Sequence, residues 1–164
     1  VYDVCYAFTD FENQHKKIYF PYKDKKNRFK STCNENDIGN INQINPFDKK
    51  LVITKSYKDC RVLRNQGINS IWLQNEGCFP DKEIIFPLIN HYEDIIVFYD
   101  NDDTGTRASK KIADIIYSEL NKGRVIHLPI DFLQDDISDI SDLIVKDKKK
   151  VVEFLRNNKV YEPT

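Results

Sequence analysis

The chain has 164 residues, of which 40% are hydrophobic and 31% charged, and its formal net charge is −1. This length suits one compact domain, and this composition excludes both a disordered chain and a membrane-embedded one. The longest apolar run, residues 95–99, is far shorter than the ~20 residues that a membrane-spanning helix needs.

The four cysteines argue against a structural zinc site and against a disulfide framework. Cys5, Cys33, Cys60 and Cys78 are widely spaced, and the sequence has no C-x-x-C pair. We therefore expect a reducing, cytoplasmic setting. Because the sequence contains no methionine, we also expect the chain to be a piece of a longer protein.

The first part of the chain, residues 1–50, predicts a small basic β-rich segment. Within it, residues 18–32 hold two aromatic and β-branched runs separated by a polar turn, which is typical of a hairpin. Residues 16–30 carry seven Lys or Arg against one Asp. Single-stranded nucleic acid binds along cationic tracks with aromatic rings for base stacking, although a lysine run is more often a solvated face. The candidate nucleic-acid contacts are Lys17, Lys23, Arg28 and Lys30.

From residue 51 onward, short apolar runs alternate with amphipathic stretches. The expected strands are residues 51–54, 70–74, 94–100 and 124–129, and the expected helices are residues 57–67, 80–92 and 104–121. Within the second helix, Pro87 predicts a kink or a break. This alternation predicts an α/β fold with a parallel sheet of about four strands, flanked by helices on both faces. We expect this domain to span residues 51–145, with residues 146–164 as a C-terminal helix and tail.

Acidic residues follow the expected strands, at the edge of a parallel sheet where ligands bind. Asp100 and Asp102 are two residues apart, which in extended chain places both carboxylates on the same side. Two like charges so close favour a bound cation, for which Mg²⁺ or Mn²⁺ is the usual solution. The alternative is that these acids only form a turn and cap the next helix.

Three stretches are informative together: LVITKSYKDCRVLRNQGINSIWLQNEG, IIVFYDNDDTGTRASKKIADIIY and SDISDLI. They resemble the Toprim domain of bacterial-type and phage DNA primases, in the phage-like version with Thr-Lys-Ser after the first strand. The resemblance covers roughly residues 16–146 and implies a Toprim-like fold. It also implies the synthesis of short RNA primers from ribonucleoside triphosphates on single-stranded DNA, with Mg²⁺ or Mn²⁺ as cofactor and a replicative helicase as partner.

The same resemblance assigns roles to acids of this sequence. Asp100 and Asp102 match the paired metal-binding aspartates of the family and are expected to be catalytic as well. Asp59 matches the acid in the helix after the first strand and is expected to be catalytic, and Asp139 and Asp142 most nearly match the later acidic pair, as metal ligands.

One position departs from the family pattern, because most Toprim domains carry Glu where this sequence has Lys55. We hypothesise that Glu76 supplies the missing negative charge and serves as a metal ligand, while Lys55 contacts a nucleotide phosphate, and we expect both to be catalytic. Lys58 is a further candidate contact for the nucleotide or nucleic acid. The alternative is that Lys55 is a solvated surface residue. An ammonium group of Lys55 inside the acidic pocket would argue against polymerase chemistry.

Two other functions remain open. The stretch IIVFYDNDDT also fits the start of a haloacid-dehalogenase-type phosphatase, with Asp100 as nucleophile and Asp102 as acid. That fold normally opens with this strand, whereas 99 residues precede Asp100 here. The second alternative is a Toprim-like module that has lost catalysis and only binds nucleic acid or a partner.

Overall fold

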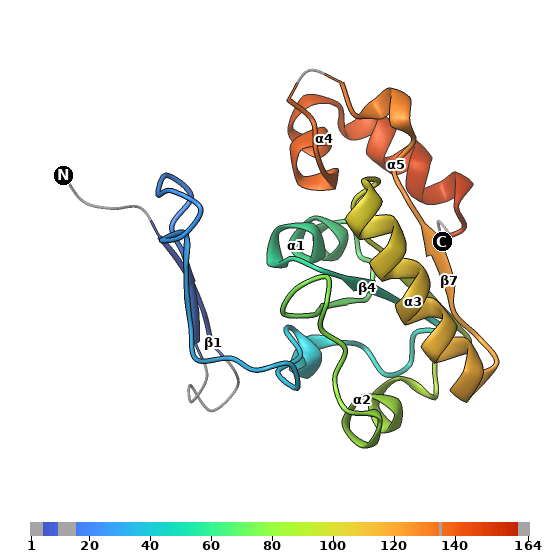
Figure 1. Cartoon of the computed structure of the whole chain (residues 1–164). Helices are drawn as coiled ribbons and strands as arrows, with labels where there is room; N and C mark the ends of the chain where they lie inside the picture. The colour runs from blue at the N-terminus through green and yellow to red at the C-terminus, as the bar shows by residue number, and fades with distance from the viewer. Residues whose placement is uncertain (1–4, 10–15, 135, 161–164) are drawn as a thin grey trace.

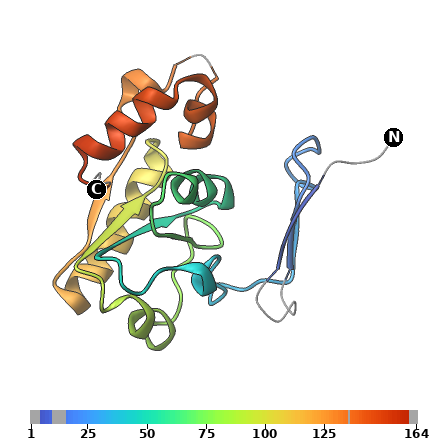
Figure 2. The same cartoon turned by 180° about the vertical axis from the view of Figure 1, so that it is seen from behind.

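The N-terminal part of the chain forms a three-stranded antiparallel sheet in the order β1-β2-β3. The computed structural model describes residues 5–9, 16–134 and 136–160. The strands are β1 (Tyr6–Thr9), β2 (Lys16–Tyr19) and β3 (Phe29–Ser31). The sequence predicts β2, β3 and the turn between them, but not β1, which is four residues long and pairs with β2. This sheet stands apart from the rest of the molecule in both views (Figures 1 and 2).

A connector of residues 32–49 joins this sheet to the main body and includes the short 3-10 helix η1 (Ile41–Gln43). Gly39 exchanges two backbone hydrogen bonds with Trp72, of 2.9 and 3.1 Å. The connector therefore extends the edge of the main sheet by one antiparallel bridge. An added Cβ at Gly39 would lie within the Trp72 ring, so this close approach requires glycine.

The main body is built on a four-stranded parallel sheet in the order β5-β4-β6-β7. Its strands are β4 (Lys50–Thr54), β5 (Ser70–Trp72), β6 (Asp94–Phe98) and β7 (Arg124–Ile126). The helices that connect them are α1 (Tyr57–Asn65), α2 (Lys82–Ile89) and α3 (Asp103–Leu120). The predicted alternation of strands and helices is confirmed. The sequence predicts a kink or a break at Pro87. In the structure Pro87 lies inside α2, and the helix continues for two more residues before it ends.

Both faces of the parallel sheet are covered, as the apolar strands predict. On one face, Leu51 and Ile53 pack in a buried cluster with residues of α2 and α3. On the other face, Val52 and Ile96 pack with α1 and with two C-terminal helices. Those two helices are α4 (Ile140–Lys146) and α5 (Lys148–Asn157), and between β7 and α4 lies the 3-10 helix η2 (Ile130–Phe132). Within α5, Val151, Phe154 and Leu155 belong to this buried cluster.

Among the described helices, none combines the length and the apolar character that crossing a bilayer requires.

Candidate active site at the ends of the parallel strands

Lys55 and Asp100 meet because they follow two neighbouring parallel strands, β4 and β6. The Lys55 Nζ atom contacts Asp100 Oδ2 and lies 2.5 Å from Glu76 Oε1. All three side chains are between 21% and 23% exposed. Lys55 is therefore not a solvated surface residue. Its partner Glu76 is the acid hypothesised to replace the usual Glu as a metal ligand, and in this structure it binds the Lys55 ammonium group.

The charges of this trio shift two pKa values. Burial alone would lower the pKa of Lys55, but its hydrogen bonds with Asp100 and Glu76 and their negative charges outweigh burial and raise it. Burial raises the pKa of Asp100, and although Lys55 opposes this, the charges of Asp139 and Glu76 add to it. Lys55 therefore stays cationic at neutral pH.

Asp59 is a buried carboxylic acid in the first turn of α1. The Ser56 side chain caps this helix: its Oγ accepts a hydrogen bond from the Asp59 backbone N–H at 3.2 Å and donates to Asp59 Oδ2 at 2.6 Å. The Asp59 side chain is only 5% exposed, and its Oδ1 atom has no hydrogen-bond partner in the described part of the chain. Burial and the negative charge of Asp139 raise its pKa to about 7.

Asp139 reaches the same region from the other end of the domain, because α4 packs against α1. It caps α4: its Oδ1 accepts hydrogen bonds from the Asp142 backbone N–H at 2.9 Å and from Ser141 Oγ at 2.6 Å. Its Oδ2 pairs with Lys58 Nζ at 3.2 Å. Lys58 is thus held at the rim by an acid far from it in sequence.

Asp59, Asp100 and Asp139 line one small pocket of about 10 Å³, together with residues of β6, its following loop and the start of α4. This volume is about that needed for one water-sized species. Lys55 is not among the residues that line this pocket, although its ammonium group contacts Asp100. The ammonium group thus lies among the acids of the site, at Asp100 and Glu76, and outside the lining of this pocket.

The donor set of this pocket suits a hard divalent ion. Within the described residues, no three His, Cys, Asp or Glu side chains are arranged closely enough to bind a metal ion by themselves. Mg²⁺ commonly takes one or two carboxylates, with waters and substrate phosphates as its other ligands. The buried Asp59 Oδ1 atom, which has no hydrogen-bond partner among the described residues, could serve as one such carboxylate ligand. The residues present therefore fit a partly hydrated ion.

Asp102 and Asp142, both expected as metal ligands, take structural positions outside this pocket. Asp102 caps α3, and its side chain accepts the Gly105 backbone N–H at 2.7 Å. Asp102 thus caps the helix, as in the turn-and-cap alternative. Asp142 accepts hydrogen bonds from the Ser138 N–H and Oγ. Burial would raise the pKa of Asp142, but these bonds outweigh it and lower the pKa.

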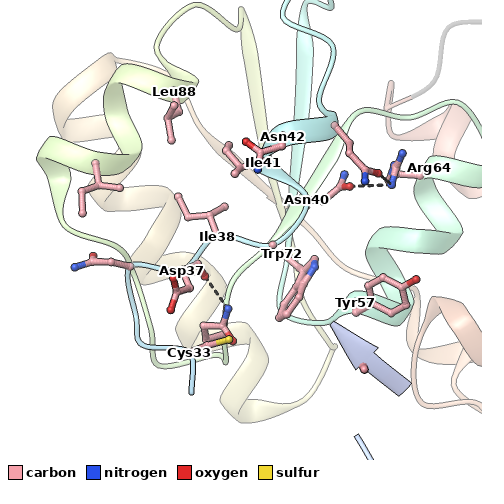
Figure 3. Close-up of a pocket in the computed structure, with 16 residues that line it drawn as sticks. Cys33, Asp37, Ile38, Asn40, Ile41, Asn42, Tyr57, Arg64, Trp72 and Leu88 are labelled. Carbon is pink, nitrogen blue, oxygen red and sulfur yellow. Dashed lines mark hydrogen bonds between the residues drawn. The ribbon is translucent and has the colours of Figure 1, made fainter. Parts of the chain in front are cut away.

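Next to the site lies a larger groove of about 570 Å³ between the connector and the edge strand β5 (Figure 3). The rings of Tyr57 and Trp72 meet edge to face there, with 6.5 Å between centroids. Arg64 donates hydrogen bonds to Asn40 and Gln43 of the connector. From the sequence, Trp72 reads as a core residue. It is indeed buried, at 6% exposed, but it also lines this groove. Its place at the carboxyl end of β5 is the signal that could have indicated this.

Lys17 joins the N-terminal sheet to the main body. Its Nζ donates a hydrogen bond to the Gln74 backbone carbonyl at 2.7 Å and lies over the rings of Trp72 and Phe29, 5.3 and 5.2 Å from their centroids. Burial lowers the pKa of Lys17. This ammonium group is therefore engaged inside the protein.

The other expected nucleic-acid contacts lie on the N-terminal sheet and its turn. Lys30 is exposed on β3, beside Phe29, which is 50% exposed. Lys23 lies over the Phe20 ring, 4.3 Å from its centroid, and Arg28 is half-buried. Cationic and aromatic groups are thus interleaved on this sheet, as the sequence suggests.

No protein-family model and no curated protein sequence matches the chain. Solved structures do match it. The primase fragment of the bacteriophage T7 primase-helicase protein superposes on 92% of this chain, with a TM-score of 0.63 and 15% identity. The DnaG primase catalytic domain bound to single-stranded DNA superposes on 95%, with a TM-score of 0.67 and 18% identity. This chain has the fold of a primase catalytic fragment.

The Escherichia coli primase catalytic core gives a similar result, with a TM-score of 0.65 over 95% of this chain at 18% identity. Because the match extends over both sheets, the predicted Toprim-like α/β fold with a preceding β-rich segment is confirmed. The chain spans 62% of the T7 fragment, 51% of the DnaG catalytic domain and 55% of the Escherichia coli core.

Proposed function

We propose that this chain is the part of a DNA primase that carries the Toprim active site, where ribonucleotides are joined into a short RNA primer on single-stranded DNA. The observation that carries the proposal is the joint match of both sheets to primase catalytic fragments, over more than nine-tenths of the chain. The acidic pocket at the ends of β4 and β6 adds the chemistry that such a reaction needs.

In this reaction the 3′-hydroxyl oxygen of the growing primer attacks the α-phosphorus of a nucleoside triphosphate. A phosphodiester bond forms, and pyrophosphate leaves with the electrons of the broken bond. Bound Mg²⁺ or Mn²⁺ would neutralise phosphate charge and align the attacking hydroxyl. Asp59, Asp100 and Asp139 would hold such an ion. Lys58, 49% exposed at the rim, is placed to attract the triphosphate.

We propose the N-terminal sheet as the track for the template strand. Its cations, Lys23, Arg28 and Lys30, would contact phosphates, and the exposed face of Phe29 would support stacking of a base. One of the similar structures is a primase domain bound to single-stranded DNA, and another comes from a primase-helicase protein. A replicative helicase, in the same chain or a separate one, is therefore the expected partner, in the cytoplasm of a bacterial or phage-infected cell.

One observation favours the non-catalytic alternative, in which the module only binds nucleic acid or a partner: Lys55 occupies oxygens of both Asp100 and Glu76. The phosphatase alternative has less support, since Asp100 as a nucleophile would have to attack phosphate while paired with an ammonium group. Both alternatives predict no primer synthesis.

The test is primer synthesis by the protein that contains this chain, with single-stranded DNA, labelled ribonucleotides and Mn²⁺. We expect Asp100→Asn to lower the rate at least 100-fold, because the site loses a carboxylate at its centre. Asp114→Asn, on the exposed face of α3, is the matched control and should leave the rate unchanged. Absent synthesis, or equal rates for the two variants, would contradict the proposal.

A further inference from the structure

Asp100 belongs to two groups of acids at the ends of the parallel strands. In the first, the Lys55 ammonium group contacts both Asp100 Oδ2 and Glu76 Oε1. The second is the small pocket of Asp59, Asp100 and Asp139, which Lys55 does not line.

The group that holds Lys55 already has its cation. Two carboxylates share one ammonium group here, and all three side chains are about four-fifths buried. A divalent ion at this position would have to displace the ammonium group, which would then lose two charge-assisted hydrogen bonds. Lys55 is therefore positioned to exclude a metal ion from the space between Asp100 and Glu76.

The pocket of Asp59, Asp100 and Asp139 differs, because one of its buried carboxylate oxygens has no hydrogen-bond partner in the part of the chain that the structure describes. Asp59 is 5% exposed and presents an oxygen atom with no hydrogen-bond partner among the described residues. In that part of the chain, Lys58 binds Asp139 at the rim and Lys55 binds Asp100, while no ammonium group pairs with Asp59. A buried, unpartnered carboxylate oxygen is costly unless a cation or a proton satisfies it.

The formal charges of these six side chains agree with a single bound divalent ion. Asp59, Asp100, Asp139 and Glu76 contribute four negative charges when ionised, and Lys55 and Lys58 contribute two positive charges. The remaining charge of −2 is neutralised by one divalent ion. Two divalent ions would leave the group with a charge of +2.

We propose that Lys55 acts as a built-in cation, so that this site takes one divalent ion, in the pocket of Asp59, Asp100 and Asp139, and none between Asp100 and Glu76. The proposal rests on the proposed function in assuming that these acids bind a divalent ion. Lys55 then takes the place of a second ion. Its ammonium group is part of the chain, so it holds Asp100 and Glu76 together and cannot dissociate as a metal ion can.

The test counts bound Mn²⁺ in the 164-residue chain by electron paramagnetic resonance titration, without nucleotide or DNA. We expect one ion for the wild-type chain and one for Lys55→Arg, which keeps the charge. Lys55→Ala removes the charge and leaves room between Asp100 and Glu76, so it should bind two. The double variant Lys55→Ala/Glu76→Gln should return to one. Asp139→Asn should weaken binding of the wild-type ion at least tenfold.

Circular dichroism of each variant separates loss of a site from loss of the fold. Two ions or none in the wild-type chain would overturn the proposal, and so would a single ion in a folded Lys55→Ala variant. Because the count needs no template or nucleotide, its outcome is distinguishable from that of primer synthesis. If the ion counts are as predicted but the protein makes no primers, the proposed function is overturned and the proposed role of Lys55 still holds.

Discussion

Asp59 has the most unusual environment of any single carboxyl group described here. Ser56 satisfies one of its oxygens, and the other faces the acidic pocket without a partner. The negative charges of Asp139 and Asp100 also face it, and only Lys58 offers opposing charge. The folded protein therefore favours the protonated form of Asp59 at a pH where an ordinary aspartate is ionised.

This shift predicts how stability depends on pH. The pKa of Asp59 is about 7 in the fold against 3.8 for an ordinary aspartate, so the folded state binds more protons than the unfolded state between these values. Without divalent ions, the free energy of unfolding should fall as the pH rises from about 4 to 7. Asp59→Asn removes this dependence and should be more stable than the wild-type chain at pH 8, by about 1–3 kcal/mol.

Urea denaturation at pH 5 and pH 8 in the presence of a chelator checks this prediction. Asp114→Asn, which changes an exposed acid, serves as the control and should follow the wild-type chain at both values. If Asp59→Asn loses as much stability as the wild-type chain between pH 5 and pH 8, then Asp59 does not carry the effect.

At the scale of elements, the start of α3 positions Asp100. The Asp102 side chain caps this helix by accepting the Gly105 N–H, and Gly105 packs closely under the preceding loop. A Cβ atom added at Gly105 would lie 2.3 Å from the backbone carbonyl oxygen of Asp100. The loop from β6 to α3 thus needs a residue without a side chain at this position.

Gly105→Ala should therefore destabilise the protein. Alanine favours a helix over glycine by about 1 kcal/mol, but relief of the overlap requires backbone movement, and we expect a net loss of about 1–3 kcal/mol. Gly77→Ala is the matched control, because the nearest atom to its added Cβ is 3.4 Å away. Thermal unfolding of both variants measures the difference, and equal melting temperatures would contradict this account of the loop.

The sequence predicts most elements because their signals are local. The apolar runs of β4 and β6 are buried on both faces of a sheet, and such runs indicate central parallel strands. The sequence does not predict β1, because these four residues become a strand only by pairing with β2, which is not a local property. The sequence also does not predict that Pro87 is accommodated within α2. The helix tolerates it because only part of one turn follows this residue.

At the scale of the whole molecule, a few specific contacts hold the N-terminal sheet to the main body. Lys17 reaches from β2 to the Gln74 carbonyl beyond β5, and Gly39 of the connector pairs with Trp72. Arg64 of α1 binds Asn40 in the connector. These contacts set the position of the proposed template track relative to the acidic pocket.

Lys17→Met should loosen this attachment. Methionine keeps much of the aliphatic side chain but removes the hydrogen bond and the charge over the Trp72 ring. We expect hydrogen exchange of the β2 and β3 amides to become about five to ten times faster, equivalent to roughly 1 kcal/mol of lost protection. Lys30→Met, at an exposed position on β3, should leave the exchange rates unchanged. Equal effects of both changes would show that Lys17 is not an anchor.

The sequence alone determined the alternation of strands and helices, the basic N-terminal segment, and the placement of Lys55 and Asp100 after their strands, because burial patterns and strand ends are local properties of the chain. Only the tertiary structure decided which acids share a pocket. Asp139 meets Lys58 across 81 residues through the packing of α4 on α1. Asp102, two residues from Asp100, instead turns to cap α3, because the cap satisfies a backbone N–H that would otherwise lack a partner.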